Sequence, residues 1–207
     1  MKTVSLLAIT VVACMVWADM ACAQTETHQF VLSSTTFQNG ATLPLSMIYN
    51  YPVNGSNICS LNGNPGRDTS PELSWTNAPT RTRSFALIVF DVTAGVMHWG
   101  MYNISAATSE LPENAGVAGS SYGQQAPNVF GDLSYDGPCP PADVAPFAHH
   151  YVFTLYALDI DLTLPGSKNF PPSALILFRA LIAAGTYHHV LGTTQISGFY
   201  STTPPSQ

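Results

Sequence analysis

The stretch "DGPCPPADVAPFAHHYVFTLYALD", residues 136–159, changes character at its midpoint. Its first half is rich in glycine, proline and aspartate, which are typical of turns. Its second half, "YVFTLYALD" (151–159), is a nearly continuous apolar run of the kind found in buried strands. Two adjacent histidines, His149 and His150, lie where the loop becomes the strand. Because proline fixes φ, this boundary predicts a stiff loop beside polar side chains at the mouth of a strand.

Comparable short runs occur on both sides of this stretch, separated by turns that contain glycine and proline. "SFALIVFD" (84–91) is almost entirely apolar and predicts a strand that is buried on both faces. Many short strands between such turns indicate a β-sandwich or a β-barrel. We expect strands at residues 29–35, 45–49, 72–75, 84–91, 98–104, 151–159 and 193–200.

One segment departs from the strand pattern. "PPSALILFRALIAAG" (171–185) begins with prolines, continues through helix-forming residues and stops at Gly185, and Arg179 is its only charged residue. It predicts a helix packed on the sheet rather than a partner-binding helix. Residues 105–147 are predicted to be mostly irregular, and loop regions of that length are usually functional or cover a site.

The N-terminus has the features of a secretory signal peptide. Lys2 precedes the apolar run "VSLLAITVVACMVW", and "ACA" fits a cleavage site after Ala23. Residues 1–23 are therefore expected to be removed, which leaves residues 24–207 as a single domain in a periplasmic or secreted protein. A lipoprotein-type signal ending at Cys14 is the alternative, although the apolar run continues past it.

Charge and cysteine content narrow the function classes. The net charge of −6 at pH 7, with few lysines and arginines, argues against binding to nucleic acid or anionic membranes. No further apolar stretch is expected to form an integral membrane segment. Once the signal is removed, Cys59 and Cys139 remain, which suggests one disulfide, with two free thiols as the alternative.

Polar residues recur where loops meet the predicted strands. Asp91 ends one strand, His98 begins the next, and His149 to Tyr151 begin a third. Each residue alone has an ordinary structural explanation, such as a turn-forming aspartate, so the interpretation depends on their convergence. Because side chains alternate along a strand, His149 and Tyr151 are expected on one face and His150 on the other.

Five motifs, in this order, resemble the phosphatidylethanolamine-binding proteins, or Raf-kinase-inhibitor-like proteins, and their bacterial branch in particular. They are "SPELSWTNAP" (70–79), "SFALIVFD", "HWGMYNI" (98–104), "GPCPP" (137–141) followed by "HHYVFTLYALD", and "HVLGTTQISGFY" (189–200). The resemblance implies a mainly β protein, an antiparallel β-sandwich with a helix near the C-terminus.

The same resemblance implies a small anion-binding cavity lined by Asp91, His98, Gly137, Pro138, His149 and Tyr151. The expected ligand is a small anion such as phosphate, a carboxylate or a phospholipid head group, with no cofactor and no metal. Imidazole, tyrosine and backbone N–H groups would donate to the anion. Asp91 would accept a hydrogen bond from a histidine instead of facing the anion.

The chain departs from the family pattern in two places. Only Asp91 of the usual D-P-D-x-P motif is kept in "DVTAG" (91–95), which predicts a short loop and a more open rim. His150 stands where the family usually has an arginine, so a fixed positive charge near the site is lost. The alternative is that His150 is only a solvent-facing replacement.

The expected function is that of an exported binding protein, with a possible protein partner, and not of an enzyme. A hydrolase using the aspartate and histidines is the main alternative, but the sequence has no G-x-S-x-G motif. A metal site is not expected, because adjacent His149 and His150 would point to opposite faces. A third alternative is a protease- or kinase-inhibiting interaction module without a small ligand.

Overall fold

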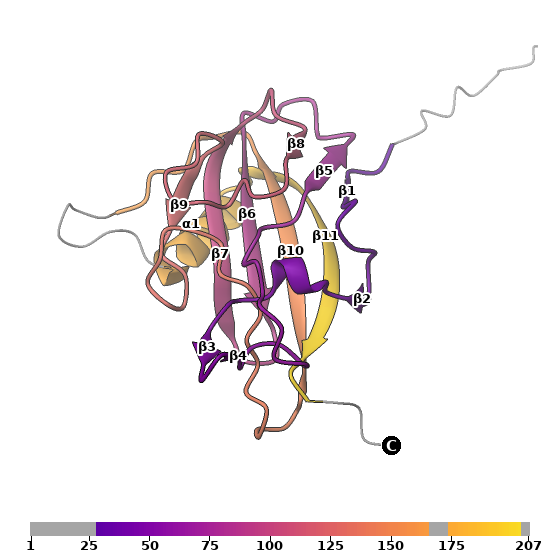
Figure 1. Cartoon of the computed structure of the whole chain (residues 1–207). Helices are drawn as coiled ribbons and strands as arrows, with labels where there is room; N and C mark the ends of the chain where they lie inside the picture. The colour runs from indigo at the N-terminus through magenta and orange to yellow at the C-terminus, as the bar shows by residue number, and fades with distance from the viewer. Residues whose placement is uncertain (1–27, 166–173, 204–207) are drawn as a thin grey trace, which may run out of the picture.

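The computed structural model describes residues 28–165 and 174–203, so the predicted signal peptide lies outside the described residues. The described chain is mostly β with one helix near the C-terminus, as predicted (Figure 1). A six-stranded sheet has the order β2-β11-β10-β6-β7-β9, and a three-stranded sheet has the order β1-β5-β8. The strands are β1 (Val31–Ser33), β2 (Ala41–Thr42), β3 (Pro52–Val53), β4 (Ser56–Asn57), β5 (Leu73–Thr76), β6 (Ser84–Asp91), β7 (Val96–Ser105), β8 (Glu110–Leu111), β9 (Gln124–Ala126), β10 (Ala148–Leu158) and β11 (Val190–Ser201).

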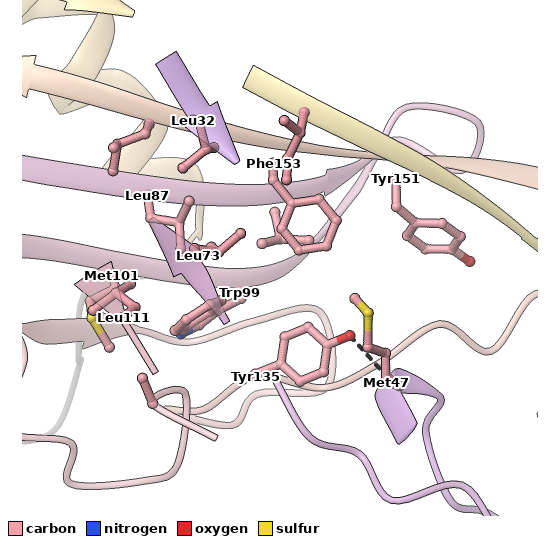
Figure 2. Packing of buried hydrophobic residues seen from close by; sticks show 14 of the residues in the cluster. Leu32, Met47, Leu73, Leu87, Trp99, Met101, Leu111, Tyr135, Tyr151 and Phe153 are labelled. Atoms are coloured by element: carbon pink, nitrogen blue, oxygen red, sulfur yellow. Dashed lines mark hydrogen bonds between the residues drawn. The ribbon is translucent and has the colours of Figure 1, made fainter. Parts of the chain in front are cut away.

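The large sheet is buried on both faces, which explains its apolar central strands. Alternate residues of β6 belong to different cores: Phe85 and Leu87 face the small sheet, and Ala86 and Ile88 face the helix. We call the core between the large and small sheets the inner core and the core between the large sheet and the helix the outer core. The inner core includes Trp99 of β7 and Phe153 of β10, the strands on either side of β6 (Figure 2). Strand β6 therefore has the bounds that the sequence predicted. All pairings in this sheet are antiparallel except the two-residue contact between β11 and β2.

The predicted strand at residues 45–49 is wrong. Residues Leu45–Met47 form a single 3-10 turn, η1, in which Met47 N–H donates to the carbonyl of Pro44 at 3.0 Å. Met47 and Ile48 are both completely buried, so the apolar residues here are consecutive and do not alternate. In the predicted irregular region 105–147, the structure adds only the short strands β8 and β9.

The predicted helix is present as α1 (Ala174–Thr186), and residues 171–173 lie outside the described part of the chain. Leu177 and Leu181 are buried in the outer core on the sheet, which confirms a helix packed against the sheet. The predicted stop at Gly185 is wrong. The helix ends in a Schellman motif: His188 has a positive φ of 62°, and His189 N–H donates to the carbonyl of Ala184 at 2.8 Å. Within residues 28–165 and 174–203, no helix is long and apolar enough to cross a membrane.

Candidate functional site

A small cavity of about 120 Å³ lies where β6, β7 and β10 meet the loop after Tyr135. It brings together four of the residues that the sequence singled out: Asp91, His98, His149 and Tyr151. Strand pairing explains part of this, because Tyr151 on β10 is directly opposite Asp91 on β6. The remaining lining residues are Ala94, Val96, Val129, Phe130, Cys139, Pro140 and Pro141.

A β-bulge brings His98 into the cavity. Val89 of β6 pairs with Trp99, and the next residue, Phe90, pairs with Met97, so His98 is an extra residue in β7. Met97 belongs to the outer core and Trp99 to the inner core, while His98 lines the cavity on the inner side. Simple alternation from Trp99 would have placed His98 on the outer face. Bulges of this kind commonly redirect a side chain beside a functional site.

Asp91 has two structural roles in the site. One carboxylate oxygen, Oδ1, accepts the backbone N–H groups of Thr93 at 2.9 Å and Ala94 at 3.0 Å, which forms the turn between β6 and β7. The other, Oδ2, lies 2.6 Å from Nδ1 of His149. The predicted aspartate–histidine hydrogen bond is therefore present, and the turn-forming explanation is also correct. The carboxylate of Asp91 therefore accepts three hydrogen bonds, which close the turn and orient His149.

His98 is held by the backbone. Its Nδ1 lies 2.8 Å from the carbonyl of Asp136 and must donate a proton to it, since a carbonyl only accepts. Burial lowers the pKa of His98, and the carbonyl of Asp136 and the nearby Asp91 charge offset part of that effect. In both cavity histidines Nδ1 is already bonded, so Nε2 is the nitrogen left for a ligand.

Tyr151 supplies a hydroxyl that lies near Asp91 but forms no hydrogen bond with the described residues. The residue is 1% exposed, and its hydroxyl is buried without a hydrogen bond. Burial and then the negative charge of Asp91 raise the pKa of Tyr151 well above its usual value, so the hydroxyl remains protonated. A buried hydroxyl without a partner is costly, and such groups in native proteins commonly belong to functional sites.

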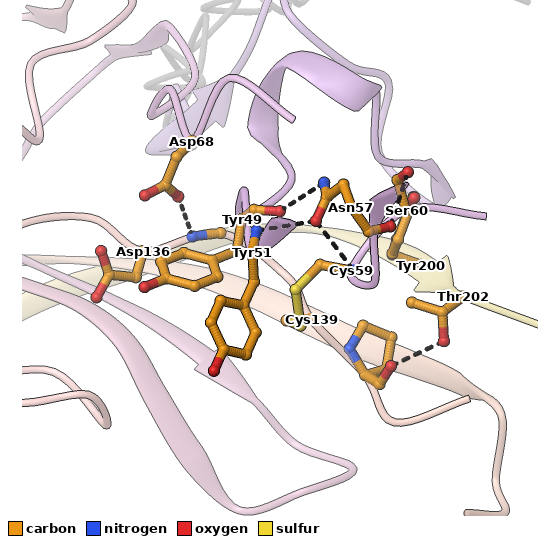
Figure 3. The surroundings of a disulfide bond; sticks show 12 residues. Tyr49, Tyr51, Asn57, Cys59, Ser60, Asp68, Asp136, Cys139, Tyr200 and Thr202 are labelled. Atoms are coloured by element: carbon orange, nitrogen blue, oxygen red, sulfur yellow. Dashed lines mark hydrogen bonds between the residues drawn. A yellow bond between two sulfur atoms is a disulfide. The ribbon is translucent and has the colours of Figure 1, made fainter. Parts of the chain in front are cut away.

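The predicted disulfide between Cys59 and Cys139 is present, and it fixes one wall of the cavity (Figure 3). The lining from this loop comes from Cys139, Pro140 and Pro141. Pro140 is tied to the residue that follows the last strand as well, since its carbonyl accepts the hydroxyl proton of Thr202 at 2.8 Å. The wall is therefore held by a covalent bond, a side-chain hydrogen bond and the restricted φ of proline.

Gly137 and Pro138 are not among the residues that line the cavity, although the backbone of Gly137 lies close to His98. Gly137 N–H donates to Asp68 Oδ1 at 2.6 Å, and the Pro138 carbonyl accepts Tyr49 N–H at 3.2 Å. A side chain at residue 137 would clash with the carbonyl of Met47, because a Cβ there would lie 1.8 Å from its oxygen. Glycine thus lets the loop pack closely on the chain beside η1.

His150 points away from the cavity, as alternation predicted. Its ring stacks on Phe199 of β11, with centroids 4.4 Å apart and an angle of 11° between the planes. The described residues contain no group of three or more histidine, cysteine, aspartate or glutamate side chains placed to hold a metal ion. The cavity residues that sequence reasoning missed include Val129 and Phe130, which lie in an irregular segment with no periodic signal.

Comparison with known proteins places this architecture in a family. Residues 33–201 match the phosphatidylethanolamine-binding protein family. A UPF0098 protein of Methanothermobacter thermautotrophicus is 36% identical over 141 residues, which cover 65% of this chain and 84% of the relative. The lipoprotein-named LppC of Mycobacterium tuberculosis strain H37Rv is 32% identical over 137 residues, which cover 65% of this chain and 58% of LppC.

Solved structures agree with this assignment. Escherichia coli YbcL, described as a member of the mammalian PEBP family, superposes with a TM-score of 0.67 at 27% identity. The match covers 84% of this chain and 99% of YbcL. The motifs, the sheet order with its C-terminal helix and the matched 33–201 range agree, and the chain belongs to the phosphatidylethanolamine-binding protein family.

Proposed function

We propose that this protein is an exported binding protein whose cavity holds a small anionic group. The observation that carries the proposal is the buried Tyr151 hydroxyl, which has no partner and lies in the same cavity as His98 and His149. A phosphate or carboxylate oxygen would satisfy this donor. Because the site is buried, such a hydrogen bond would be stronger than one formed in water.

The histidines make the proposed binding depend on protonation. With Nδ1 donating to Asp136 or Asp91, a neutral ring has an unprotonated Nε2, which is an acceptor and repels an anion. Protonation converts Nε2 into a charged donor. An anion therefore binds the imidazolium form, and its affinity should decrease as pH rises through the histidine pKa values. For His98 this decrease starts below the usual value near 6.5, since burial lowers its pKa.

A hydrolase is the second candidate, because the His149–Asp91 pair has the arrangement of a general base and its orienting acid. The described cavity lining offers no serine, threonine or free cysteine beside that pair, since Cys139 is in the disulfide. We therefore propose binding without turnover. Sustained turnover on a panel of carboxyl esters and phosphoesters, lost in His149→Ala, would favour the hydrolase.

Three observations support export. The N-terminal sequence has the pattern of a secretory signal, and the related LppC is named as a lipoprotein. A disulfide between Cys59 and Cys139 suits an oxidising compartment. A protein partner modulated by ligand binding is a further part of the proposal, and pull-down with the loaded and unloaded protein would test it.

Calorimetric titration with acetate at pH 5.5 tests the binding proposal. Tyr151→Phe removes only the hydroxyl, and we expect acetate affinity to fall about five- to tenfold, which corresponds to one lost hydrogen bond. Folding stability should stay the same or rise, because the free protein loses a buried unsatisfied group.

Tyr200→Phe is the matched control. Tyr200 is also a buried tyrosine, but its hydroxyl accepts Leu61 N–H at 3.3 Å and it does not line the cavity. The Tyr200→Phe variant should be less stable than the wild-type protein and should bind acetate with unchanged affinity. Undetectable acetate binding to the wild-type protein, or equal affinity in Tyr151→Phe, would refute the anion pocket.

A further inference from the structure

A second, larger cavity opens directly beside the anion pocket. It has a volume of about 730 Å³ and is lined by Tyr49, Tyr51, Ile58, Phe130, Cys139, Pro140, Pro141, Ala142 and Asp143. Phe130, Cys139, Pro140 and Pro141 line both cavities. We call the larger one the aromatic groove. The two cavities are therefore adjacent, with these four residues between or beside them.

Phe130 forms the boundary between the two cavities. On one side its ring stacks on Tyr49, with centroids 5.1 Å apart and planes 12° apart. On the other side it meets the ring of His98 edge-on, with centroids 6.2 Å apart. The same ring therefore contacts a residue proposed to bind the anion and a wall of the groove.

The groove offers exposed apolar surface rather than polar partners. Tyr51, Ile58 and Phe130 are 55%, 49% and 50% exposed in the described structure. Figure 3 shows the rings of Tyr49 and Tyr51 near the disulfide, whose Cys139 also lines the groove. Rings and prolines present flat faces, which suit an aromatic group by stacking and edge contacts.

Charge at the groove limits what a ligand can carry there. Its only charged lining residue is Asp143, and the lining has no lysine, arginine or histidine. Close to Tyr49 lie further acids: burial, and after it the charges of Asp136 and Asp68, raise the pKa of its hydroxyl. A second negative charge in the groove would therefore be repelled.

We propose that the ligand has a single anionic group joined by a short linker to an aromatic body, with the anion in the pocket and the aromatic body in the groove. This inference rests on the proposed function and defines the ligand class for the same site. The groove selects by apolar contact and by exclusion of a second anion, while the pocket supplies the charge recognition.

Calorimetry at pH 5.5 with propionate and 3-phenylpropionate tests the groove separately from the pocket. Both ligands carry the same carboxylate, and only the second adds a ring. We expect 3-phenylpropionate to bind at least about tenfold more tightly, because half-burying a ring removes apolar area from water. The dianion 3-(4-carboxyphenyl)propionate should bind less tightly than 3-phenylpropionate, because its second carboxylate would meet Asp143.

Tyr51→Ala is the diagnostic variant, since the side chain is exposed and no hydrogen bond of its hydroxyl supports the fold. It should weaken 3-phenylpropionate about five- to tenfold and change propionate affinity less than twofold. Tyr187→Ala is the matched control: Tyr187 is 73% exposed and does not line the groove. This variant should bind both ligands as the wild-type protein does.

The outcomes separate the two proposals. Equal affinity for propionate and 3-phenylpropionate would overturn the groove proposal and leave the anion pocket standing. The same loss for both ligands in Tyr51→Ala would also overturn it, since the residue would then act on the pocket. Failure of both ligands to bind would refute the proposed function itself, and the inference with it.

Discussion

The described chain contains two histidine–aspartate pairs with similar geometry and different surroundings. His149 Nδ1 lies 2.6 Å from Asp91, and their side chains are 8% and 2% exposed. His189 Nδ1 lies 2.8 Å from Asp159 beyond the end of α1, and their side chains are 41% and 25% exposed. The first pair lines a cavity with an unpartnered hydroxyl, whereas the second is not among the residues lining that cavity. The comparison shows that burial and neighbours, more than the pair itself, distinguish a candidate site from a surface contact.

The largest expected effect comes from removing the disulfide that supports the cavity around the His149–Asp91 pair. The double substitution Cys59→Ala and Cys139→Ala removes a crosslink between residues 80 apart in sequence. We expect a loss of about 4 kcal/mol in the free energy of unfolding, from the added freedom of the unfolded chain. Urea unfolding measures this loss. Acetate affinity should fall as well, because the wall of the cavity is released, while the His189–Asp159 contact stays intact. A variant that unfolds like the wild-type protein would contradict the structural role of the disulfide.

A core substitution on the opposite face of the sheet separates stability from binding. Leu177→Ala removes a completely buried side chain from the outer core, and the expected cost is about 3 kcal/mol. Acetate affinity should not change, because Leu177 packs against the face that points away from the cavity. Thermal unfolding and calorimetry on the same sample measure both quantities. An unchanged melting temperature would mean that α1 is not part of the core.

Matched substitutions of the two aspartates test the comparison itself. Asp91→Asn places an amide N–H₂ or a weaker acceptor against His149, so we expect a loss of about 2 kcal/mol in stability. Acetate affinity at pH 5.5 should fall, because His149 loses the carboxylate that orients it. Asp159→Asn should cost about 0–1 kcal/mol, as is usual for exposed pairs. Urea unfolding would show equal losses for the two variants if burial had no influence.

Two further acids, Asp68 and Asp136, have raised pKa values, and their effect on stability therefore depends on pH. Burial raises the pKa values of Asp68 and Asp136 to about 6, with the charge of Asp132 contributing to both. The folded state therefore binds these protons more tightly than the unfolded state, for which about 3.9 is usual. Their contribution to stability is fully present below about pH 4 and is lost as pH rises through about 6.

Asp136→Asn tests this contribution, because Oδ1 of an asparagine can still accept the Asn128 amide that now donates to Asp136 at 2.7 Å. The variant should raise the free energy of unfolding by about 1–2 kcal/mol at pH 7.5 and change it little at pH 4. Urea unfolding at the two pH values measures the difference. Destabilisation at pH 7.5 would show that Asp136 is favourably ionised in the folded protein.

The two adjacent histidines and the bulged one show how far the sequence could predict this site. Alternation along β10 correctly separated His149 from His150, because both residues lie in regular register with Tyr200 and Phe199 of β11. The same rule would have misplaced His98 relative to Trp99, since a bulge breaks the alternation there. His98 was singled out by its place at the start of a predicted strand and by the family motif, and not by periodicity.

Other features carried too little local signal. The bounds of β6 were predictable because both of its faces are buried, which makes the whole segment apolar. The turn η1 and the two-residue strands β2, β3 and β4 are too short to show any period. Phe130 reaches the cavity from an irregular segment whose path depends on tertiary contacts, such as Val129 N–H with the carbonyl of Met97 at 2.8 Å. The cavity wall therefore lies two residues further along the proline-rich loop than Gly137 and Pro138 suggested.

The most direct test of the account is the pH dependence of acetate affinity, since acetate keeps one charge from pH 5.5 to 8. We expect calorimetry to show affinity at least about tenfold higher at pH 5.5 than at pH 8, because a protonated imidazole adds a charged donor. His149→Ala should remove most of this difference, whereas His150→Ala, on the opposite face, should retain it. Equal wild-type affinity at the two pH values, or a larger loss in His150→Ala than in His149→Ala, would contradict the account.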